Sequence, residues 1–296
     1  MVSILIPIYN YCVTELLHAL KLELDTIDCK YEILCCEDGS NRCVEENAKI
    51  ISEIDHATHI ISERNIGRIA TRQKLAHLSK YDHLVFLDAD VLPLNNHLIS
   101  TYLKYFPNQY DAVYGGYYYS ETKPNSNLTL RWRYGKNYEQ VDAHVRNKKP
   151  YKIVISGNFL IKKQLFLDIN SKIKSAGYGY DNYFGALLKT KKSSVLHINN
   201  HVLHNGLDTN AVYLKKIEKS VETIFELHYK FSQFTTDITL LEVFKNIDKL
   251  GISKLIAWMF TILKSSLKKQ LLGSSPNLKL LQFYKLGYLC VLTKSR

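Results

Sequence analysis

The stretch His83-Leu84-Val85-Phe86-Leu87-Asp88-Ala89-Asp90-Val91 decides the fold of this chain. Four apolar residues followed by acidic ones predict a buried parallel strand that delivers two carboxylates at its carboxyl end. Ligands bind at that end in open α/β sheets. Because two aspartates one residue apart are costly to bury in an apolar interior, Asp88 and Asp90 are expected to face a cation or a polyol. The simplest interpretation is a divalent ion that bridges a diphosphate, and the alternative is a solvated turn.

Strand and helix patterns alternate through the first ninety residues. The predicted elements are strand 2–8, helix 11–23, strand 31–36, helix 44–54, strand 59–62, helix 67–78 and the strand that ends at Asp88. This order implies right-handed crossovers and a parallel sheet, in which every loop that follows a strand opens on the same edge. Asn10, Asp38 and residues 64–67 are therefore expected to converge with residues 88–90 on one site.

Two of these polar segments suit a nucleotide. Asp38 ends a strand and is followed by Gly and Ser, which suits hydrogen bonds from a base or a ribose, and the alternative is a cap for the following helix. Gly67 opens a helix whose N-terminus attracts phosphate, while Arg68 and Arg72 lie four residues apart on one face, which suits a diphosphate. The alternative for the two arginines is a solvated basic helix face.

Four motifs together resemble the inverting glycosyltransferases of family 2, which have the GT-A fold and use a nucleotide-sugar. They are Ser3-Ile4-Leu5-Ile6-Pro7-Ile8-Tyr9-Asn10, Glu37-Asp38-Gly39-Ser40, Asn65-x-Gly67 with Arg72, and Asp88-Ala89-Asp90. The resemblance implies an α/β fold with a Rossmann-like nucleotide-binding half and a mixed sheet. It also implies that the donor is bound by Pro7, Tyr9, Asn10, Asp38, Asn65, Gly67, Arg68, Arg72, Asp88 and Ala89. Within that set, Asp38 would contact the nucleobase, usually uracil, and Asp88 would lie near the ribose and the sugar.

The middle of the chain is expected to supply the acceptor side. Residues 111–119 are predicted to form one tyrosine-rich strand, and residues 131–145 one helix. Gly157 and Asn158 resemble the family's Gly-Asn segment that backs the donor sugar, and Gly157 would allow close approach of the backbone.

Asp181 is the candidate catalytic base. It opens a predicted helix in a segment rich in glycine and tyrosine, and inverting transfer needs a group that takes the proton of the acceptor hydroxyl. The family usually shows Glu-Asp here, and this segment is one residue shorter. Either Asp181 is the base, which we prefer, or it replaces the Glu and Asn182 has replaced the Asp. A helix cap is the structural alternative.

The resemblance also implies a divalent metal ion. Asp90 matches the aspartate that coordinates manganese or magnesium on the diphosphate, and His204, just before Asn-Gly, matches the position of a further metal contact. Imidazole suits Mn²⁺ better than Mg²⁺, so Mn²⁺ is favoured.

The C-terminal part of the chain carries most of the charge. The net charge is +11, and residues 249–296 contain nine Lys or Arg and no Asp or Glu. The expected domains are 1–208, a GT-A domain with a nucleotide-binding half (1–90) and an acceptor half (91–208), and 209–296, a basic helical extension. One predicted helix carries an apolar stripe of Ile252, Leu255, Ile256, Met259, Ile262, Leu263, Leu267 and Leu271, with Lys254, Lys264, Lys268 and Lys269 beside it. This pattern fits a helix on an anionic membrane surface or, alternatively, a helix packed on the catalytic domain. Nucleic acid is not expected as a partner, because few aromatic residues lie between the basic ones.

The cysteines and the N-terminus favour a cytoplasmic location. Six cysteines show no C-x-x-C pair, which suits a reducing compartment. Met1 runs directly into the first strand, so no signal peptide is expected. The chain is thus predicted to be cytoplasmic, and the basic C-terminal part adds the expectation that it binds peripherally to the inner face of the plasma membrane.

These observations predict a metal-dependent inverting glycosyltransferase. It would move a sugar from a nucleotide-sugar, UDP-linked by resemblance, to a hydroxyl of a glycan or lipid-linked acceptor in the synthesis of a surface polysaccharide or glycoconjugate. One alternative is a non-catalytic GT-A module that binds a nucleotide or glycan and docks to a membrane. The other is a phosphotransferase in which Asp88 is the nucleophile.

Overall fold

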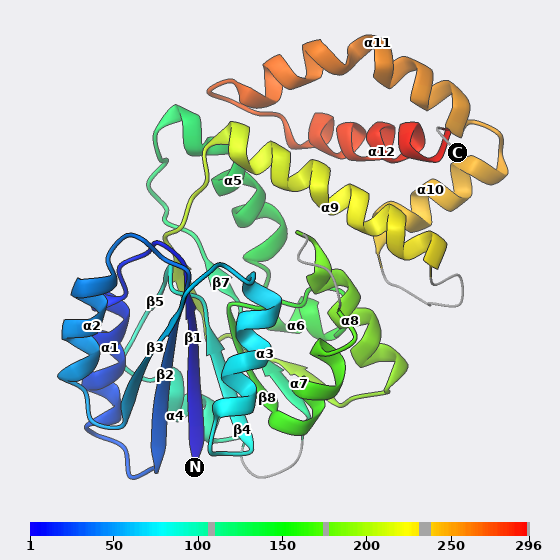
Figure 1. Cartoon of the computed structure of the whole chain (residues 1–296). Helices are drawn as coiled ribbons and strands as arrows, with labels where there is room; N and C mark the ends of the chain where they lie inside the picture. Colours follow the sequence, from blue (N-terminus) through cyan, green and yellow to red (C-terminus); the bar gives the residue numbers. More distant parts are fainter. Residues whose placement is uncertain (106–109, 174–177, 231–237, 295–296) are drawn as a thin grey trace.

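A computed structural model describes residues 1–105, 110–173, 178–230 and 238–294 of the chain. It contains a seven-stranded sheet in the order β3-β2-β1-β4-β8-β6-β9 and a three-stranded sheet in the order β5-β10-β7. Helices flank the large sheet, and a layer of C-terminal helices lies beyond one of its edges (Figure 1). The predicted α/β class with a mixed sheet and a C-terminal helical part is confirmed.

The strands of the large sheet run in both directions. They are β1 (Val2–Ile8), β2 (Tyr31–Asp38), β3 (Ala57–Ser62), β4 (His83–Leu87), β8 (Asn158–Lys162), β6 (Ala112–Tyr114) and β9 (Val195–His197). β1 pairs in parallel with β2 and β4, and β2 with β3, whereas β8 is antiparallel to both β4 and β6. The small sheet consists of β5 (Val91–Pro93), β10 (Val202–His204) and β7 (Tyr117–Tyr118). As predicted, the carboxyl ends of β1, β2 and β4 open on one edge.

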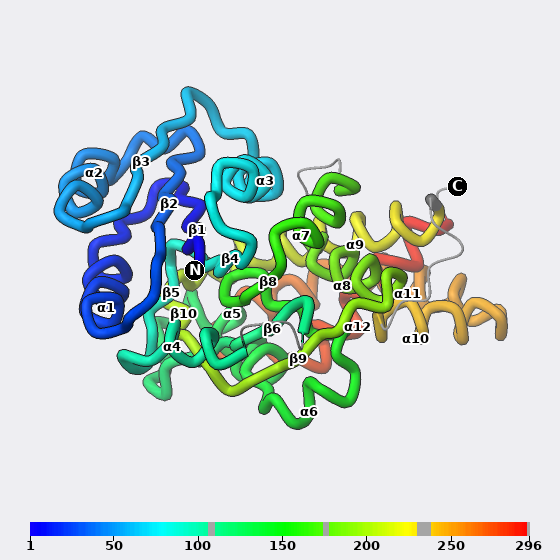
Figure 2. The backbone as a smooth tube through the Cα atoms, turned by 90° about the horizontal axis from the view of Figure 1, so that it is seen from below, coloured from blue at the N-terminus to red at the C-terminus, as the bar shows by residue number. Residues whose placement is uncertain are grey.

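Each face of the large sheet is covered by its own helices (Figure 2). On one face lie α1 (Thr14–Leu24), α2 (Val44–Ser52) and α4 (Leu98–Leu103), and on the other lie α3 (Arg68–Leu78), α7 (Lys163–Asn170) and α8 (Tyr180–Thr190). Successive side chains of a strand point to opposite faces of the sheet, and in β1, β2 and β4 both sets are mostly buried. Ile4 and Ile6 therefore join the first core with Leu17, while Leu5 joins the second with Leu75.

The predicted single strand at 111–119 is wrong, because the chain changes sheets at Gly115 and Gly116. β6 ends before these glycines and β7 begins after them. Gly116 has φ +96°, and a Cβ at Gly115 would lie 2.4 Å from the Asn158 amide nitrogen and 2.5 Å from the Tyr102 hydroxyl. Only glycines allow this crossing between the sheets.

The predicted helix over 131–145 is also wrong, because it is interrupted. The segment forms α5 (Thr129–Tyr134), a π-helical turn (Gly135–Glu139) and α6 (Ala143–Asn147). The ring of Tyr119 packs on the backbone at Gly135, where a Cβ would lie 2.1 Å from the ring. The turn places Glu139 toward Tyr119 and Arg131, as π-helical turns often do at functional sites.

The C-terminal helices pack on α5 and on one another. They are α9 (Asn210–Lys230), α10 (Thr239–Lys249), α11 (Ser253–Leu272) and α12 (Leu278–Lys294). Leu130 of α5 lies in one core with Tyr213, Phe260 and Tyr284 from α9, α11 and α12. Among the described helices, none is by itself long and apolar enough to cross a membrane; α10 and α11 together meet that test as a pair bent by 115°.

The predicted apolar stripe of α11 is divided between two sides of the helix. Leu267 and Leu271 are buried, together with Ala257 and Phe260, against the neighbouring helices. The other stripe residues that are exposed are Ile252, Leu255, Met259, Ile262 and Leu263. The prediction of a single stripe is therefore corrected, because α11 is apolar on both its inner and its outer side.

Candidate functional site

The polar loops after β1, β2 and β3 meet, as the parallel order predicts. The backbone N–H of Asn10 donates to Ser40 Oγ (2.9 Å), and Asn10 Oδ1 accepts from the N–H of Asn41 (2.8 Å). Asn10 has φ 53°, a left-handed conformation in which asparagine is enriched. Asn10 thus joins the end of β1 to the loop after β2.

Asp38 joins the loop after β2 to the start of α3. Its Oδ1 accepts from the N–H of Ile66 (2.7 Å) and its Oδ2 from the N–H of Gly67 (2.9 Å). A Cβ at Gly39 would lie 2.3 Å from the Asn65 nitrogen, so the two loops touch. The alternative that Asp38 caps α2 is wrong, since Cys43 occupies that position. Asp38 is 4% exposed, and its carboxylate has lone pairs left for one further donor at the edge.

Asp88, at the end of β4, is held from two sides. The guanidinium of Arg72 on α3 donates to its Oδ1, and the Tyr117 hydroxyl donates to its Oδ2 (3.1 Å). Burial opposes ionisation of Asp88, but Arg72, Arg68 and His204 outweigh it and lower the pKa of this carboxyl. Because Arg72 is buried and paired, a solvated basic face for this arginine is excluded. Both Asp88 oxygens are occupied, which argues against Asp88 as an attacking nucleophile.

Gly157 lies against Asp88 and leaves no space for a side chain. A Cβ there would lie 1.9 Å from the Tyr117 hydroxyl and 2.3 Å from Asp88 Oδ2. The predicted close approach of the backbone at Gly157 is thus present, and it is made to Asp88.

Asn158 faces the protein rather than the open edge of the sheet. Its Oδ1 accepts from the Tyr102 hydroxyl (2.7 Å), and its amide nitrogen donates to the carbonyls of Gly116 (3.0 Å) and Asn200 (2.7 Å). The side chain is 0% exposed. The prediction that Asn158 binds the donor is therefore corrected: its polar atoms are consumed in holding the crossing between the sheets.

Asp90 and His204 face each other across the edge of the small sheet. The Asp90 Oδ2 and His204 Nε2 atoms are 3.8 Å apart. Asp90 directly precedes β5, and His204 is the last residue of β10, which pairs with β5. A Cβ at Gly206 would lie 1.7 Å from Asp90 Oδ2, so the glycine leaves space for this carboxylate. Burial raises the pKa of Asp90 despite the nearby His204, and burial lowers the pKa of His204. The imidazole is therefore neutral near pH 7, as a metal ligand must be.

This pair fits a divalent metal ion as a partial ligand set. Among the described residues, no group of three or more His, Cys, Asp or Glu side chains is arranged to hold an ion. Asp90 and His204 would thus supply two ligands, and phosphate or water oxygens would supply the others. The neutral imidazole and one carboxylate suit Mn²⁺, and the buried Nδ1 of His204 has no hydrogen-bond partner among the described residues.

A layer of buried charge lies behind His204 and was missed by sequence reasoning. The His204 ring stacks on Tyr119 (5.5 Å between centroids), whose hydroxyl donates to Glu139. Glu139 Oε2 also accepts from Arg131 (2.9 Å), and the Arg131 guanidinium lies over the rings of Tyr119 and Tyr213. This layer connects the His204 imidazole to α9. One signal was present, because Tyr117 and Tyr119 are two residues apart and so share a face of an extended segment.

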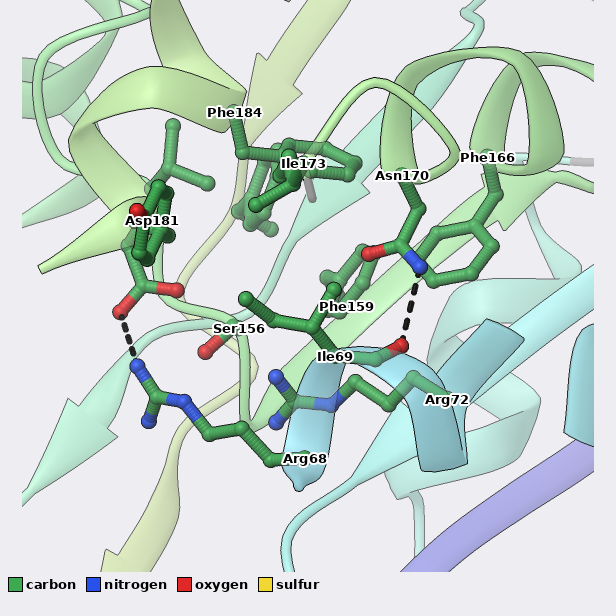
Figure 3. A pocket seen from close by; sticks show the side chains of 13 residues that line it. Arg68, Ile69, Arg72, Ser156, Phe159, Phe166, Asn170, Ile173, Asp181 and Phe184 are labelled. Carbon is green, nitrogen blue, oxygen red and sulfur yellow. Dashed lines mark hydrogen bonds and ion pairs between the residues drawn. The ribbon is translucent and has the colours of Figure 1, made fainter. Parts of the chain in front are cut away.

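Asp181 lies beside Arg68 at the mouth of a cavity (Figure 3). The Asp181 Oδ2 and Arg68 Nη2 atoms are 3.4 Å apart, and both side chains are more than a third exposed. Asp181 is in the first turn of α8, whose cap is Gly179 with φ 96°, so the alternative that Asp181 caps this helix is wrong. The cavity behind the pair is lined by Ile69, Phe159, Phe166, Ile173 and Phe184, among others, and its volume of about 20 Å³ holds roughly one water. It is too small for a nucleotide, which must bind on the open side of the pair.

The other predicted donor-binding residues lie along the same edge. Tyr9 is 56% exposed and Asn65 is exposed, while Pro7 and Ala89 are half-buried. These four are placed where a nucleotide could reach them, and their contacts with it remain predictions.

Comparisons with known proteins identify the family. Residues 3–169 match the model described as Glycosyl transferase family 2. "Glycosyltransferase GlyA" of Streptococcus pneumoniae serotype 4 is 24% identical over 210 residues, which are 67% of this chain and 29% of that protein. The chain thus matches less than a third of the length of this curated relative.

Two solved structures share the fold. The mannosyltransferase PcManGT of Pyrobaculum calidifontis, in complex with GDP-Man and Mn²⁺, has a TM-score of 0.53 at 12% identity and covers 99% of this chain and 86% of its own. A mycobacterial protein has the same score and identity, over 77% of this chain and 74% of its own. The expected GT-A fold is confirmed, and the chain belongs to glycosyl transferase family 2, a family of glycosyltransferases.

Proposed function

We propose that this chain transfers a sugar from a nucleotide-sugar to an acceptor hydroxyl with inversion, in a reaction that depends on a divalent metal ion. The observation that carries the proposal is the meeting of four groups at one edge: the Asp90–His204 pair, the Arg72–Asp88 pair, Asp181, and Asp38 with the two backbone amides that it bonds. Uridine diphosphate is the proposed nucleotide, because the remaining lone pairs of Asp38 suit an imide N–H. The GDP-Man of PcManGT makes guanosine diphosphate the second one to test.

The cationic and metal-binding groups would act on the leaving diphosphate. Asp90 and His204 would hold a metal ion, Mn²⁺ or Mg²⁺, which when bound neutralises charge on the phosphates. Arg68 lies at the open edge and is 37% exposed, so it can donate bidentate hydrogen bonds to a phosphate. Arg72, which is paired with Asp88, would hold that carboxylate in position for the ribose and the sugar. Preorganised positive charge of this kind stabilises the transition state as the diphosphate leaves.

Asp181 would take the proton of the acceptor hydroxyl. Its contact with Arg68, at 3.4 Å, is at the outer limit of a hydrogen bond. A diphosphate is a stronger partner for a guanidinium than one carboxylate at this distance. Donor binding would therefore draw Arg68 away and leave Asp181 as an unpaired base, so the enzyme would gain its base only after the donor has bound.

The acceptor is proposed to be a hydroxyl of a glycan or a lipid-linked glycan, in the synthesis of a surface polysaccharide or glycoconjugate. The half-buried ring of Tyr178, whose centroid lies 5.4 Å from the Arg68 guanidinium carbon, would be available to stack on a sugar ring.

The test is a panel of UDP- and GDP-sugars with Mn²⁺, assayed by thermal shift and by donor hydrolysis. We expect one donor to stabilise the protein in the presence of metal and to be hydrolysed slowly. Asp90→Ala should lose the metal-dependent stabilisation. Asp181→Asn should keep it and lose about 10²- to 10⁴-fold in turnover.

The stereochemistry and the two alternatives are tested in the same assay. The first product seen by proton NMR should have the anomeric configuration opposite to that of the donor. Binding of a donor without turnover under any acceptor would favour the non-catalytic module. The absence of any stabilisation by nucleotide-sugars would refute the proposal.

A further inference from the structure

The outer side of α11 is an exposed apolar surface. Leu255 (54%), Trp258 (59%) and Ile262 (60%) are more than half exposed, and Ile252, Met259 and Leu263 are exposed beside them. We call these six residues the α11 outer face. Their spacing of three and four residues places them on one side of the helix, and α11 is the outermost helix of the C-terminal layer (Figure 1).

The opposite side of α11 is already buried in protein. Ala257 packs with residues of α9, α10 and α12, and Phe260, Leu267 and Leu271 pack with residues of α9 and α12. A helix with one apolar stripe would be satisfied by this packing. Since α11 has a second apolar side, its outer face requires a further partner, and an exposed patch of this kind marks an interaction surface.

The charged side chains of α11 itself are all lysines. Three lysines of the C-terminal region contact other residues of the protein. Lys268 pairs with Glu218 (2.9 Å), Lys264 lies over the rings of Phe260 and Tyr288, and Lys285 lies over the ring of Tyr134. This corrects the prediction that Lys264 and Lys268 flank an outer stripe. Lys249, at the end of α10, and Lys254 and Lys269, near the start and the end of α11, are exposed.

The acidic residues near this surface lie on α10. Asp248 accepts from the Ser253 hydroxyl (2.6 Å) at the beginning of α11, and Glu242 is exposed further back on α10. From residue 249 onward the sequence has no acid. The surface along α11 is therefore apolar with a basic rim.

We propose that the α11 outer face docks on an anionic lipid membrane, with α11 parallel to the membrane plane. A helix with Trp and Leu on one side and lysines beside it is the pattern of an interfacial helix, bound both by apolar insertion and by attraction to anionic lipids. A second copy of the chain is a poorer partner, because a twofold contact would bring like charges together. The inner side stays in its protein core, so the membrane contacts only the outer side.

This surface would hold the enzyme at the membrane independently of catalysis. α12 and α9 lie between α11 and the sheet in Figure 1, so the α11 outer face shares no residue with the site at the strand ends. Membrane binding and sugar transfer can therefore be lost separately.

The test is sedimentation of the full chain with vesicles of phosphatidylcholine alone or with about one third phosphatidylglycerol. We expect binding to the anionic vesicles at moderate salt. Leu255→Gln with Ile262→Gln should weaken it about tenfold or more. The matched control is Leu22→Gln with Leu78→Gln, which are equally exposed leucines on α1 and α3, and it should bind like the parent.

A second pair of variants tests the basic rim. Lys254→Gln with Lys269→Gln should weaken binding to anionic vesicles by about fivefold per lysine, whereas Lys148→Gln with Lys149→Gln, exposed lysines at the C-terminal end of α6, should not. Trp258 reports directly on insertion: it is one of two tryptophans, and in a Trp132→Phe background its emission should shift to the blue when anionic vesicles are added.

Three results would overturn the proposal. One is binding to neither kind of vesicle. Another is binding that the apolar variants leave unchanged. The third is a concentration-dependent dimer in lipid-free buffer that the apolar variants abolish, which would make a second copy the partner of this surface. Donor hydrolysis in lipid-free solution should be the same in the four double variants as in the parent. A loss of membrane binding is therefore distinguishable from a failure of the proposed function.

Discussion

Gly206→Ala tests the metal site with the smallest possible change. A Cβ at this position would lie 1.7 Å from Asp90 Oδ2 and 2.5 Å from Asp90 Cγ, whereas ordinary contact begins at 3.4 Å. The carboxylate must therefore retreat by about 1.7 Å, the difference between the two distances. The Asp90 carboxylate can turn away because its side chain is 28% exposed, whereas Asp90 Cβ, 2.8 Å from the new Cβ, requires a small local shift of the backbone.

The displacement is large compared with what catalysis tolerates. Functional groups must be held within about 0.5 Å of their productive positions, and a misplacement of 1 Å can cost about 10²-fold in rate. We expect Gly206→Ala to lower donor hydrolysis about 10²-fold and to raise the Mn²⁺ concentration for half-maximal activity at least tenfold. The melting temperature should change by no more than about 3 °C, which corresponds to about 1 kcal/mol for a chain of this size.

Two measurements check this prediction. Mn²⁺ binding is followed by electron paramagnetic resonance with the nucleoside diphosphate present, and donor hydrolysis is titrated with Mn²⁺. The matched control is Gly273→Ala, where the nearest atom to the new Cβ is the Gln270 carbonyl oxygen at 3.3 Å. An unchanged Mn²⁺ titration with full activity in Gly206→Ala would refute the assignment of Asp90 as a metal ligand.

Two further predictions concern stability. Arg146 is 2% exposed and donates to His197 Nδ1 and to four carbonyls, those of Val141, Tyr114, Gly115 and Ile198. Since Lys cannot reproduce this planar array of donors, Arg146→Lys should lower the free energy of unfolding by about 3 kcal/mol. Urea unfolding measures this change, and a loss under about 1 kcal/mol would contradict the prediction. Burial lowers the pKa of His197 to about 4. The unfolded chain then binds more protons between pH 6.5 and pH 4, so the free energy of unfolding should fall by about 3 kcal/mol as the pH falls through that range, a contribution that His197→Asn should remove.

The nucleotide-binding half could be predicted from sequence because its information is local. Alternating apolar strands and helices set a parallel order, and that order alone places Asn10, Asp38 and Asp88 on one edge. The contacts between Asp38 and the amides of Ile66 and Gly67 follow once the strand ends meet. What the pattern could not give is the partner of each group: the bonds from Asp38 to the amides just before α3, rather than a cap on α2, depend on the close contact at Gly39.

The acceptor half was predicted less well because its order depends on long-range contacts. The tyrosine-rich segment looks like one strand until Asn158 and Arg146, from elsewhere in the chain, bond the backbone at Gly115 and Gly116. The helix over 131–145 likewise breaks where the ring of Tyr119 packs on Gly135. In both places the regular backbone pattern is interrupted by contacts with a buried polar or aromatic side chain from elsewhere in the chain. The periodicity of the local sequence cannot predict such contacts.

A membrane surface and the catalytic domain were the two alternative partners expected for a C-terminal helix with one apolar stripe. In the structure, α11 has two apolar sides. Phe260 and Leu267 turn inward to the core shared with α5 and α9, while Trp258 and Ile262 turn outward. Packing of α11 on the domain is therefore compatible with membrane docking, and it supports it: the inner contacts fix which side of the helix remains exposed, so that the apolar outer face is presented as a preformed surface rather than assembled on the lipid.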